Sequence, residues 1–131
     1  MEIAFWQAYL ITLAIETPVL VLFLFFSSRD SVNRLTMSAF PNKFSTKKII
    51  ANSLAANTLT LPIVWFVFPF LAGSLGVGYP LQIVVSESFA FAAETLVYWR
   101  LFRPISLRDA ALASFVCNAS SMLAWACLLV L

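Results

Sequence analysis

Long apolar segments alternate with shorter polar stretches along this chain of 131 residues. The apolar segments cover residues 3–26, 49–72, 81–102 and 110–131. Each is close to the roughly 20 residues that a helix needs to cross about 30 Å of hydrocarbon. The segments are apolar on nearly all sides, whereas strands of a membrane barrel alternate in polarity. The pattern predicts an all-α integral membrane protein, with four transmembrane helices in an up-down bundle that forms a single domain over residues 1–131.

The composition supports a chain whose solvent is lipid. Hydrophobic residues make up 62% of the sequence and charged residues 11%, and a soluble domain of this length cannot bury so much apolar surface. The first segment contains Glu16 and Pro18, is longer than a usual signal-peptide core and has no basic stretch before it. We therefore expect a retained helix rather than a cleaved signal peptide.

The basic residues predict how the chain is oriented in the membrane. All eight lie near two of the connections between segments, as Arg29, Arg34, Lys43, Lys47 and Lys48 and as Arg100, Arg103 and Arg108. The remaining connection, residues 73–80, has no charge. Because basic connections stay in the cytoplasm, we expect a plasma-membrane protein with both termini outside the cytoplasm.

The connection over residues 27–48 is the longest polar stretch. Val32, Leu35 and Met37 lie there among basic and hydroxyl residues, which predicts a short interfacial helix ended by Pro41. Its simplest role is a solvated connector that contacts anionic lipid headgroups. The alternative is a docking site for a partner within a homo-oligomer or a larger membrane complex.

Two parts of the chain repeat a polar pattern. The stretch AIETPVLV (14–21) is similar to AAETLVYW (92–99), and SLAANTLT (53–60) is similar to SFVCNASS (114–121). The matching positions are the polar ones, which a membrane composition does not supply by itself. We therefore predict two helical hairpins of one kind, related by a pseudo-two-fold axis normal to the membrane.

The repeated polar residues also share a depth. At 1.5 Å per residue, two carboxyls and two amides lie about 9–15 Å from the cytoplasmic ends of their helices. Hydroxyl residues three and four positions away extend the same helix faces. The predicted ligand- or ion-binding residues are Glu16, Asn57, Glu87, Glu94 and Asn118, with Ser53, Thr60, Tyr98, Ser114 and Ser121 as secondary candidates.

A carboxylate that faces lipid alone is too costly, so Glu16 and Glu94 must be neutral, paired or wet. Arg100 is the nearest cation in the sequence, and we expect both carboxyls to be protonated when the site is dry. One interpretation is a transport protein with a proton or cation pathway through this layer. A second is an accessory subunit in which Glu–Asn hydrogen bonds only link helices. A third, less favoured, is an intramembrane enzyme that acts on lipid.

Other chemistry finds little support in the sequence. The chain has no histidine, and Cys117 and Cys127 lie too far apart on one helix to form a disulfide. We see no phosphate-binding loop, nucleophile elbow or zinc motif, and expect no catalytic residue, metal, cofactor or nucleic-acid partner. Pro18 and Pro62 each remove a helical hydrogen bond near the polar layer. Several aromatic residues near span ends are typical of interfacial anchors, namely Trp6, Tyr9, Tyr79, Tyr98 and Trp99.

Overall fold

A computed structural model of the chain describes residues 5–34, 45–102 and 105–130, and every element within them is helical. The elements are α1 (Phe5–Arg34), α2 (Thr46–Pro62), η1 (Ile63–Val67), α3 (Phe68–Leu75), α4 (Tyr79–Leu101) and α5 (Leu107–Val130). Within these residues, four helical stretches are long and apolar enough to span a membrane, which confirms that part of the prediction. They are Phe5–Phe26, Thr46–Leu75, Tyr79–Leu101 and Leu107–Cys127.

Helix α1 extends beyond its predicted end at residue 26 and continues to Arg34. Residues 27–34 contain neither proline nor glycine, so no backbone signal ends the helix where the apolar segment ends. These residues therefore belong to α1 and not to a separate connection. The rest of the predicted interfacial helix, with Leu35, Met37 and Pro41, lies outside the described residues.

The second membrane-length stretch changes its helical geometry at Pro62. Proline has no backbone N–H to donate to the preceding turn. Directly after it, η1 is a π-helical turn in which the N–H of Phe68 donates to the carbonyl of Ile63, one residue further back than in an α-helix. The stretch then continues as α3 and ends at Gly76, whose φ of 64° suits a residue without a side chain.

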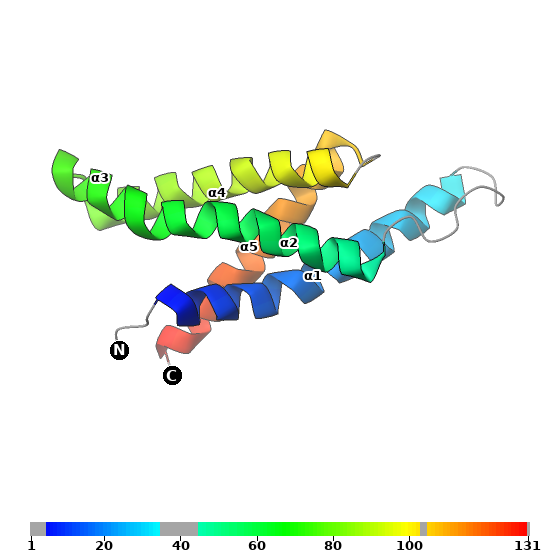
Figure 1. Cartoon of the computed structure of the whole chain (residues 1–131), viewed down its shortest axis with the longest axis horizontal. Helices are drawn as coiled ribbons and strands as arrows, with labels where there is room; N and C mark the ends of the chain where they lie inside the picture. The colour runs from blue at the N-terminus through cyan, green and yellow to red at the C-terminus, as the bar shows by residue number, and fades with distance from the viewer. Residues whose placement is uncertain (1–4, 35–44, 103–104, 131) are drawn as a thin grey trace.

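Each long helix packs against two others. Helix α1 packs against α2 and α5, and α4 packs against the same two helices. The start of α1 and the end of α5 lie at one end of the molecule, the end that also holds α3 and the start of α4 (Figure 1). We call the half of the molecule nearest this end the terminal half. The other half, which holds the start of α2 and the end of α4, is the connection half.

The connection half contains the apolar core. Its buried side chains come from all four long helices and form one cluster: Leu20, Leu24, Ile49, Ala56, Tyr98, Phe102, Ala110, Ala113 and Cys117. Tyr98 is fully buried there, so its prediction as an interfacial anchor was wrong, because its ring packs against Phe102 inside the cluster. By contrast, Trp6 and Tyr79 are 69% and 71% exposed in the terminal half, as interfacial anchors are.

The outward faces of the helices are apolar. Phe70 and Leu75, for example, are 73% and 75% exposed. So much exposed hydrocarbon is unfavourable in water and favourable in lipid. These faces fit an integral membrane protein. The start of α5 is polar instead. The backbone N–H of Asp109 donates to Ser106 Oγ at 3.1 Å, and this hydroxyl donates to Oδ2 of Asp109 at 2.8 Å.

Candidate functional site

Glu16 of α1 is held between two other helices. The residue is 1% exposed. Asn57 of α2 donates its Nδ2 to Oε2 of Glu16 at 2.9 Å, and Ser121 of α5 donates its Oγ to Oε1 at 2.8 Å. Both oxygens of this buried carboxyl therefore accept a hydrogen bond, which offsets part of the cost of removing the group from water.

Glu94 of α4 has a similar set of partners and is 2% exposed. Asn118 of α5 donates its Nδ2 to Oε2 of Glu94 at 2.6 Å. Thr60 of α2 donates its Oγ1 to Oε1 at 3.4 Å, and Ser114 of α5 donates to Oε2 at 3.3 Å. This carboxyl thus connects α4 to α5 and to α2.

The two amides are positioned in the same way. Asn57 Nδ2 also donates to the backbone carbonyl of Ser53 at 3.2 Å, and Asn118 Nδ2 donates to the carbonyl of Ser114 at 2.9 Å. Each amide therefore turns its nitrogen both to its own helix, four residues back, and to a glutamate of a neighbouring helix. This double contact fixes the amide orientation and directs a donor at each carboxyl.

Both glutamates lie at a cavity of about 660 Å³ in the terminal half. Its polar lining is Thr12, Glu16, Asn57, Thr60, Glu87, Glu94, Asn118 and Ser121. Its apolar and aromatic lining is Leu61, Val64, Trp65, Tyr79, Ile83, Ala90, Met122, Trp125 and Ala126. On the other side of the glutamates begins the apolar cluster of the connection half. The carboxyls therefore lie at the floor of the cavity, where open space meets a packed core.

The described lining of the cavity includes three carboxyls and no lysine or arginine. Within the part of the chain that the structure describes, neither Glu16 nor Glu94 forms an ion pair. Arg100, the cation proposed from the sequence, is exposed and lies over the ring of Trp99, 5.2 Å from its centroid. The cavity is therefore a site of negative charge whenever its carboxyls ionise.

Two of the four buried polar atoms that have no hydrogen-bond partner among the described residues belong to predicted site residues. They are Oδ1 of Asn57 and the hydroxyl of Tyr98. Asn57 lines the cavity, but its Oδ1 is itself buried, and Tyr98 belongs to the apolar cluster below. An unsatisfied buried polar group costs about 1–3 kcal/mol, so each of these positions is less stable than a fully hydrogen-bonded one.

The structure brings most of the predicted residues together. Those that line the cavity are Glu16, Asn57, Thr60, Glu87, Glu94, Asn118 and Ser121. The other predicted residues lie outside it. Ser114 donates a hydrogen bond to Glu94, and the hydroxyl of Ser53 is hydrogen-bonded to that of Thr17 at 3.0 Å. Tyr98 packs in the apolar cluster.

Among the lining residues that the sequence prediction did not include are one threonine and two tryptophans. Thr12 lies four residues before Glu16, so the helical period could have placed it on the same face. Trp65 and Trp125 each follow a polar helix face, eight residues after Asn57 and seven after Asn118. The sequence therefore shows them as counterparts in the repeat whose spacing differs by one residue, although it does not assign them to the site. The π-helical turn η1 holds Trp65 and takes up the additional residue.

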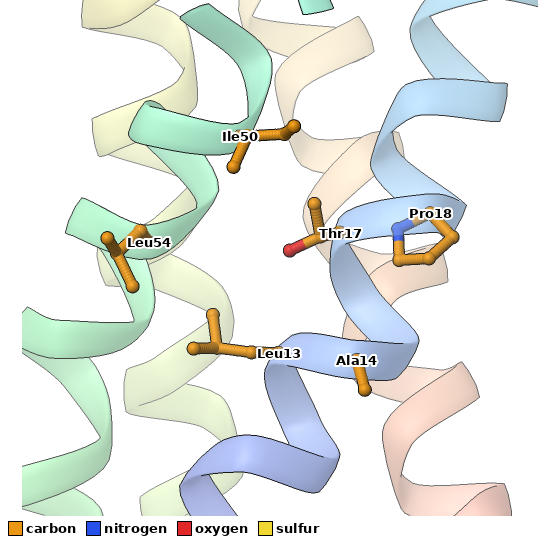
Figure 2. A pocket seen from close by; sticks show the side chains of 6 residues that line it. All are labelled: Leu13, Ala14, Thr17, Pro18, Ile50 and Leu54. Atoms are coloured by element: carbon orange, nitrogen blue, oxygen red, sulfur yellow. The ribbon is translucent and has the colours of Figure 1, made fainter. Parts of the chain in front are cut away.

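A second, shallower pocket lies between α1 and α2 and has a different character. Its volume is about 380 Å³, and Figure 2 shows the six residues that line it, Leu13, Ala14, Thr17, Pro18, Ile50 and Leu54. The ring of Pro18 points away from α2, and Thr17 points toward it (Figure 2). The lining is almost entirely hydrocarbon and partly exposed, so this groove suits a lipid chain better than a polar ligand.

The chain matches no family model, no curated protein and no solved structure. Its function is therefore inferred from the cavity and the side chains that line it. Carboxyls at the floor of an apolar cavity can bind and release protons, attract cations and accept hydrogen bonds.

Proposed function

We propose that this chain is a small membrane transport protein in which Glu16 and Glu94 bind and release protons or cations. The observation that carries the proposal is the position of both carboxyls at the floor of the cavity, without a basic residue in its described lining. A carboxylate in such a place needs a proton, a cation or water as its partner. The replacement of one of these partners by another at the carboxylate is the elementary step of a proton or cation pathway.

We further propose that the chain is an internal repeat of two hairpins in an up-down four-helix bundle. The first hairpin is α1 with the stretch from α2 to α3, and the second is α4 with α5. Exchange of the two hairpins maps Asn57 onto Asn118 and Thr60 onto Ser121. Each glutamate accepts a hydrogen bond from the asparagine amide of its own hairpin and another from a hydroxyl group of the other hairpin. In many transporters, two repeats related by such an axis move against each other, so that the binding site opens first to one side of the membrane and then to the other.

The orientation that we propose places the terminal half outside the cytoplasm. The positive-inside rule supports it, because Lys47 and Lys48 at the start of α2 and Arg108 at the start of α5 all lie in the connection half. These side chains would contact anionic headgroups of the inner leaflet of a plasma membrane. The cavity then opens outward, and the apolar cluster separates the carboxyls from the cytoplasm.

An accessory subunit of a larger membrane complex is the second candidate. The observation in its favour is that every oxygen of the Glu16 and Glu94 carboxyls already accepts a hydrogen bond. Such bonds link membrane helices at about 0.6 kcal/mol each, and at most about 2 kcal/mol. In that case the cavity would be a space that a partner fills.

Proton uptake by reconstituted protein separates the two candidates. In liposomes with an internal pH dye, we expect the parent protein to admit protons after an external acid pulse. Glu16→Gln and Glu94→Gln keep the shape and the capacity for hydrogen bonding, so they should unfold near the parent temperature but lose uptake at least tenfold. Asp109→Asn is the matched control, because this residue caps α5 away from the cavity.

Two results would contradict the transport proposal. One is a parent protein whose uptake does not exceed that of empty liposomes. The other is unchanged uptake in both glutamine variants. Either result would leave the accessory subunit as the better interpretation of the hydrogen-bonded glutamates.

A further inference from the structure

We propose that the ligand of the cavity is an organic ammonium ion with an apolar body, and that it displaces the protons of the glutamates when it binds. This inference rests on the proposed function for the role of Glu16 and Glu94. It goes further by naming the class of ligand and by assigning Trp65 and Trp125 to its binding.

The size of the cavity favours an organic ligand over a bare ion. A water molecule occupies about 30 Å³ in the liquid, so the 660 Å³ of the cavity corresponds to about twenty waters. Small-molecule pockets have volumes of roughly 300–1,000 Å³. A proton or a metal ion alone would fill only a small part of this space.

The composition of the walls gives the apolar part of the ligand. Between the carboxyl floor and the terminal end, the walls include Val64, Ile83 and Met122 together with the indoles of Trp65 and Trp125. Phe5 of α1 packs against Trp65, with ring centroids 5.9 Å apart in an edge-to-face arrangement. Aromatic faces around a cavity bind organic cations through the ring quadrupole, at about 0.5–2 kcal/mol per contact.

The polar groups give the charged part of the ligand. Glu16, Glu87 and Glu94 all line the cavity, and they attract a positive charge because no basic residue in the described lining opposes them. An ammonium group with several N–H donors can donate to more than one of these carboxylates, whereas a ligand that only accepts hydrogen bonds cannot bind an ionised carboxylate.

A metal ion fits the same groups less well. Within the described residues, no three His, Cys, Asp or Glu side chains are grouped so that they could hold a metal ion. The carboxyl oxygens of Glu16 and Glu94 instead face amide and hydroxyl donors. Mg²⁺ and Ca²⁺ require six or more oxygen ligands around one point, which a wide cavity with an apolar wall does not offer.

Equilibrium binding to the full chain in lipid nanodiscs tests this assignment. The probe is 2-phenylethylammonium, and its uncharged counterpart is 2-phenylethanol; empty nanodiscs correct for partition into lipid. We expect saturable binding of the ammonium ion with release of protons into a weak buffer. The alcohol should bind at least tenfold more weakly, and sodium, potassium and magnesium chlorides should not compete beyond the effect of ionic strength.

Substitutions then locate the bound probe. Glu94→Gln should weaken binding at least tenfold, and Trp65→Leu and Trp125→Leu should each weaken it about fivefold. Trp6→Leu is the matched control, because Trp6 is exposed and is not part of the cavity lining. If a leucine variant does not fold, Ala126→Phe replaces it, since a phenyl ring at this lining position occupies the space of the ligand and should abolish binding.

The results distinguish this inference from the proposed function. The ligand assignment is overturned if the alcohol binds as tightly as the ammonium ion, if Ala126→Phe binds like the parent, or if the parent transports protons but does not bind the probe. Binding of the probe by a parent that admits no protons would support the ligand site and contradict transport. Loss of binding in Ala126→Phe with proton uptake intact would support both proposals.

Discussion

The two halves of the molecule are made from the same four helical stretches but have opposite interiors. In the connection half the facing positions are Leu20, Leu24, Ile49, Phe102 and small residues, and they fill the space between the helices. In the terminal half the facing positions around Glu16 and Glu94 enclose a cavity of about 660 Å³. The polar layer lies at the boundary between them. A closed half below the carboxyls and an open half above them are what a site that opens to one side at a time requires.

The cost of removing packed side chains should differ most between the halves. Leu20→Ala in the connection half leaves a void in the cluster and should lower the free energy of unfolding by about 2–4 kcal/mol. Met122→Ala at the cavity wall removes a side chain that is 46% exposed and should lower it by less than about 1 kcal/mol. Reversible unfolding in mixed micelles measures both values. Equal losses would contradict the contrast between a packed half and an open half.

The rate at which a water-soluble reagent modifies a cysteine should also differ between the halves, by about a hundredfold. In a chain with Cys117→Ala and Cys127→Ala, one new cysteine is placed at Ala126 in the cavity lining or at fully buried Ala113. A thiosulfonate with a quaternary ammonium group, which does not cross lipid, should modify Ala126→Cys rapidly and Ala113→Cys hardly at all.

The same reagent tests the proposed orientation. Added outside intact cells, it should reach Ala126→Cys if the terminal half faces outward. If Ala126→Cys is modified only after the membrane is permeabilised, the terminal half faces the cytoplasm and the proposed orientation is wrong. Slow modification of both cysteines would show that the cavity does not admit water, and rapid modification of both would show that the connection half is not closed.

Much of the fold could be predicted from the sequence because lipid imposes one simple pattern on every span. Four apolar segments of sufficient length predicted four helices, and the structure confirms them in the described residues. The end of α1 could not be placed, because residues 27–34 continue the helix without any stop signal. The length of an apolar segment reflects the thickness of the membrane, but it carries no information on how far the helix continues beyond that segment.

The polar layer was also visible in the sequence, since Glu and Asn at matching depths in apolar segments are too costly to be incidental. The cavity above the polar layer could not be predicted from the sequence. Its shape depends on how the helices separate and on the π-helical turn after Pro62, which places Trp65 at the wall. The sequence showed this turn only as an unequal spacing, eight residues from Asn57 to Trp65 against seven from Asn118 to Trp125.

The smallest expected effect tests whether the two glutamates are equivalent. Thr60 donates to Glu94 at 3.4 Å and Ser121 donates to Glu16 at 2.8 Å, and the proposed repeat makes these two hydroxyls counterparts. Thr60→Ala and Ser121→Ala should each lower the free energy of unfolding by about 0.6 kcal/mol, the usual value for such a bond between membrane helices.

The two hydroxyls also have to be compared with each other. Both side chains are buried and both retain a second acceptor on their own helix, the carbonyl of Ala56 for Thr60 and that of Asn118 for Ser121. If the hairpins are counterparts, the exchanged pair Thr60→Ser with Ser121→Thr should therefore keep both bonds and change stability by less than about 0.5 kcal/mol. A loss above 2 kcal/mol in one alanine variant and none in the other would show that the glutamates are bound differently and that the pseudo-two-fold symmetry does not extend to the site.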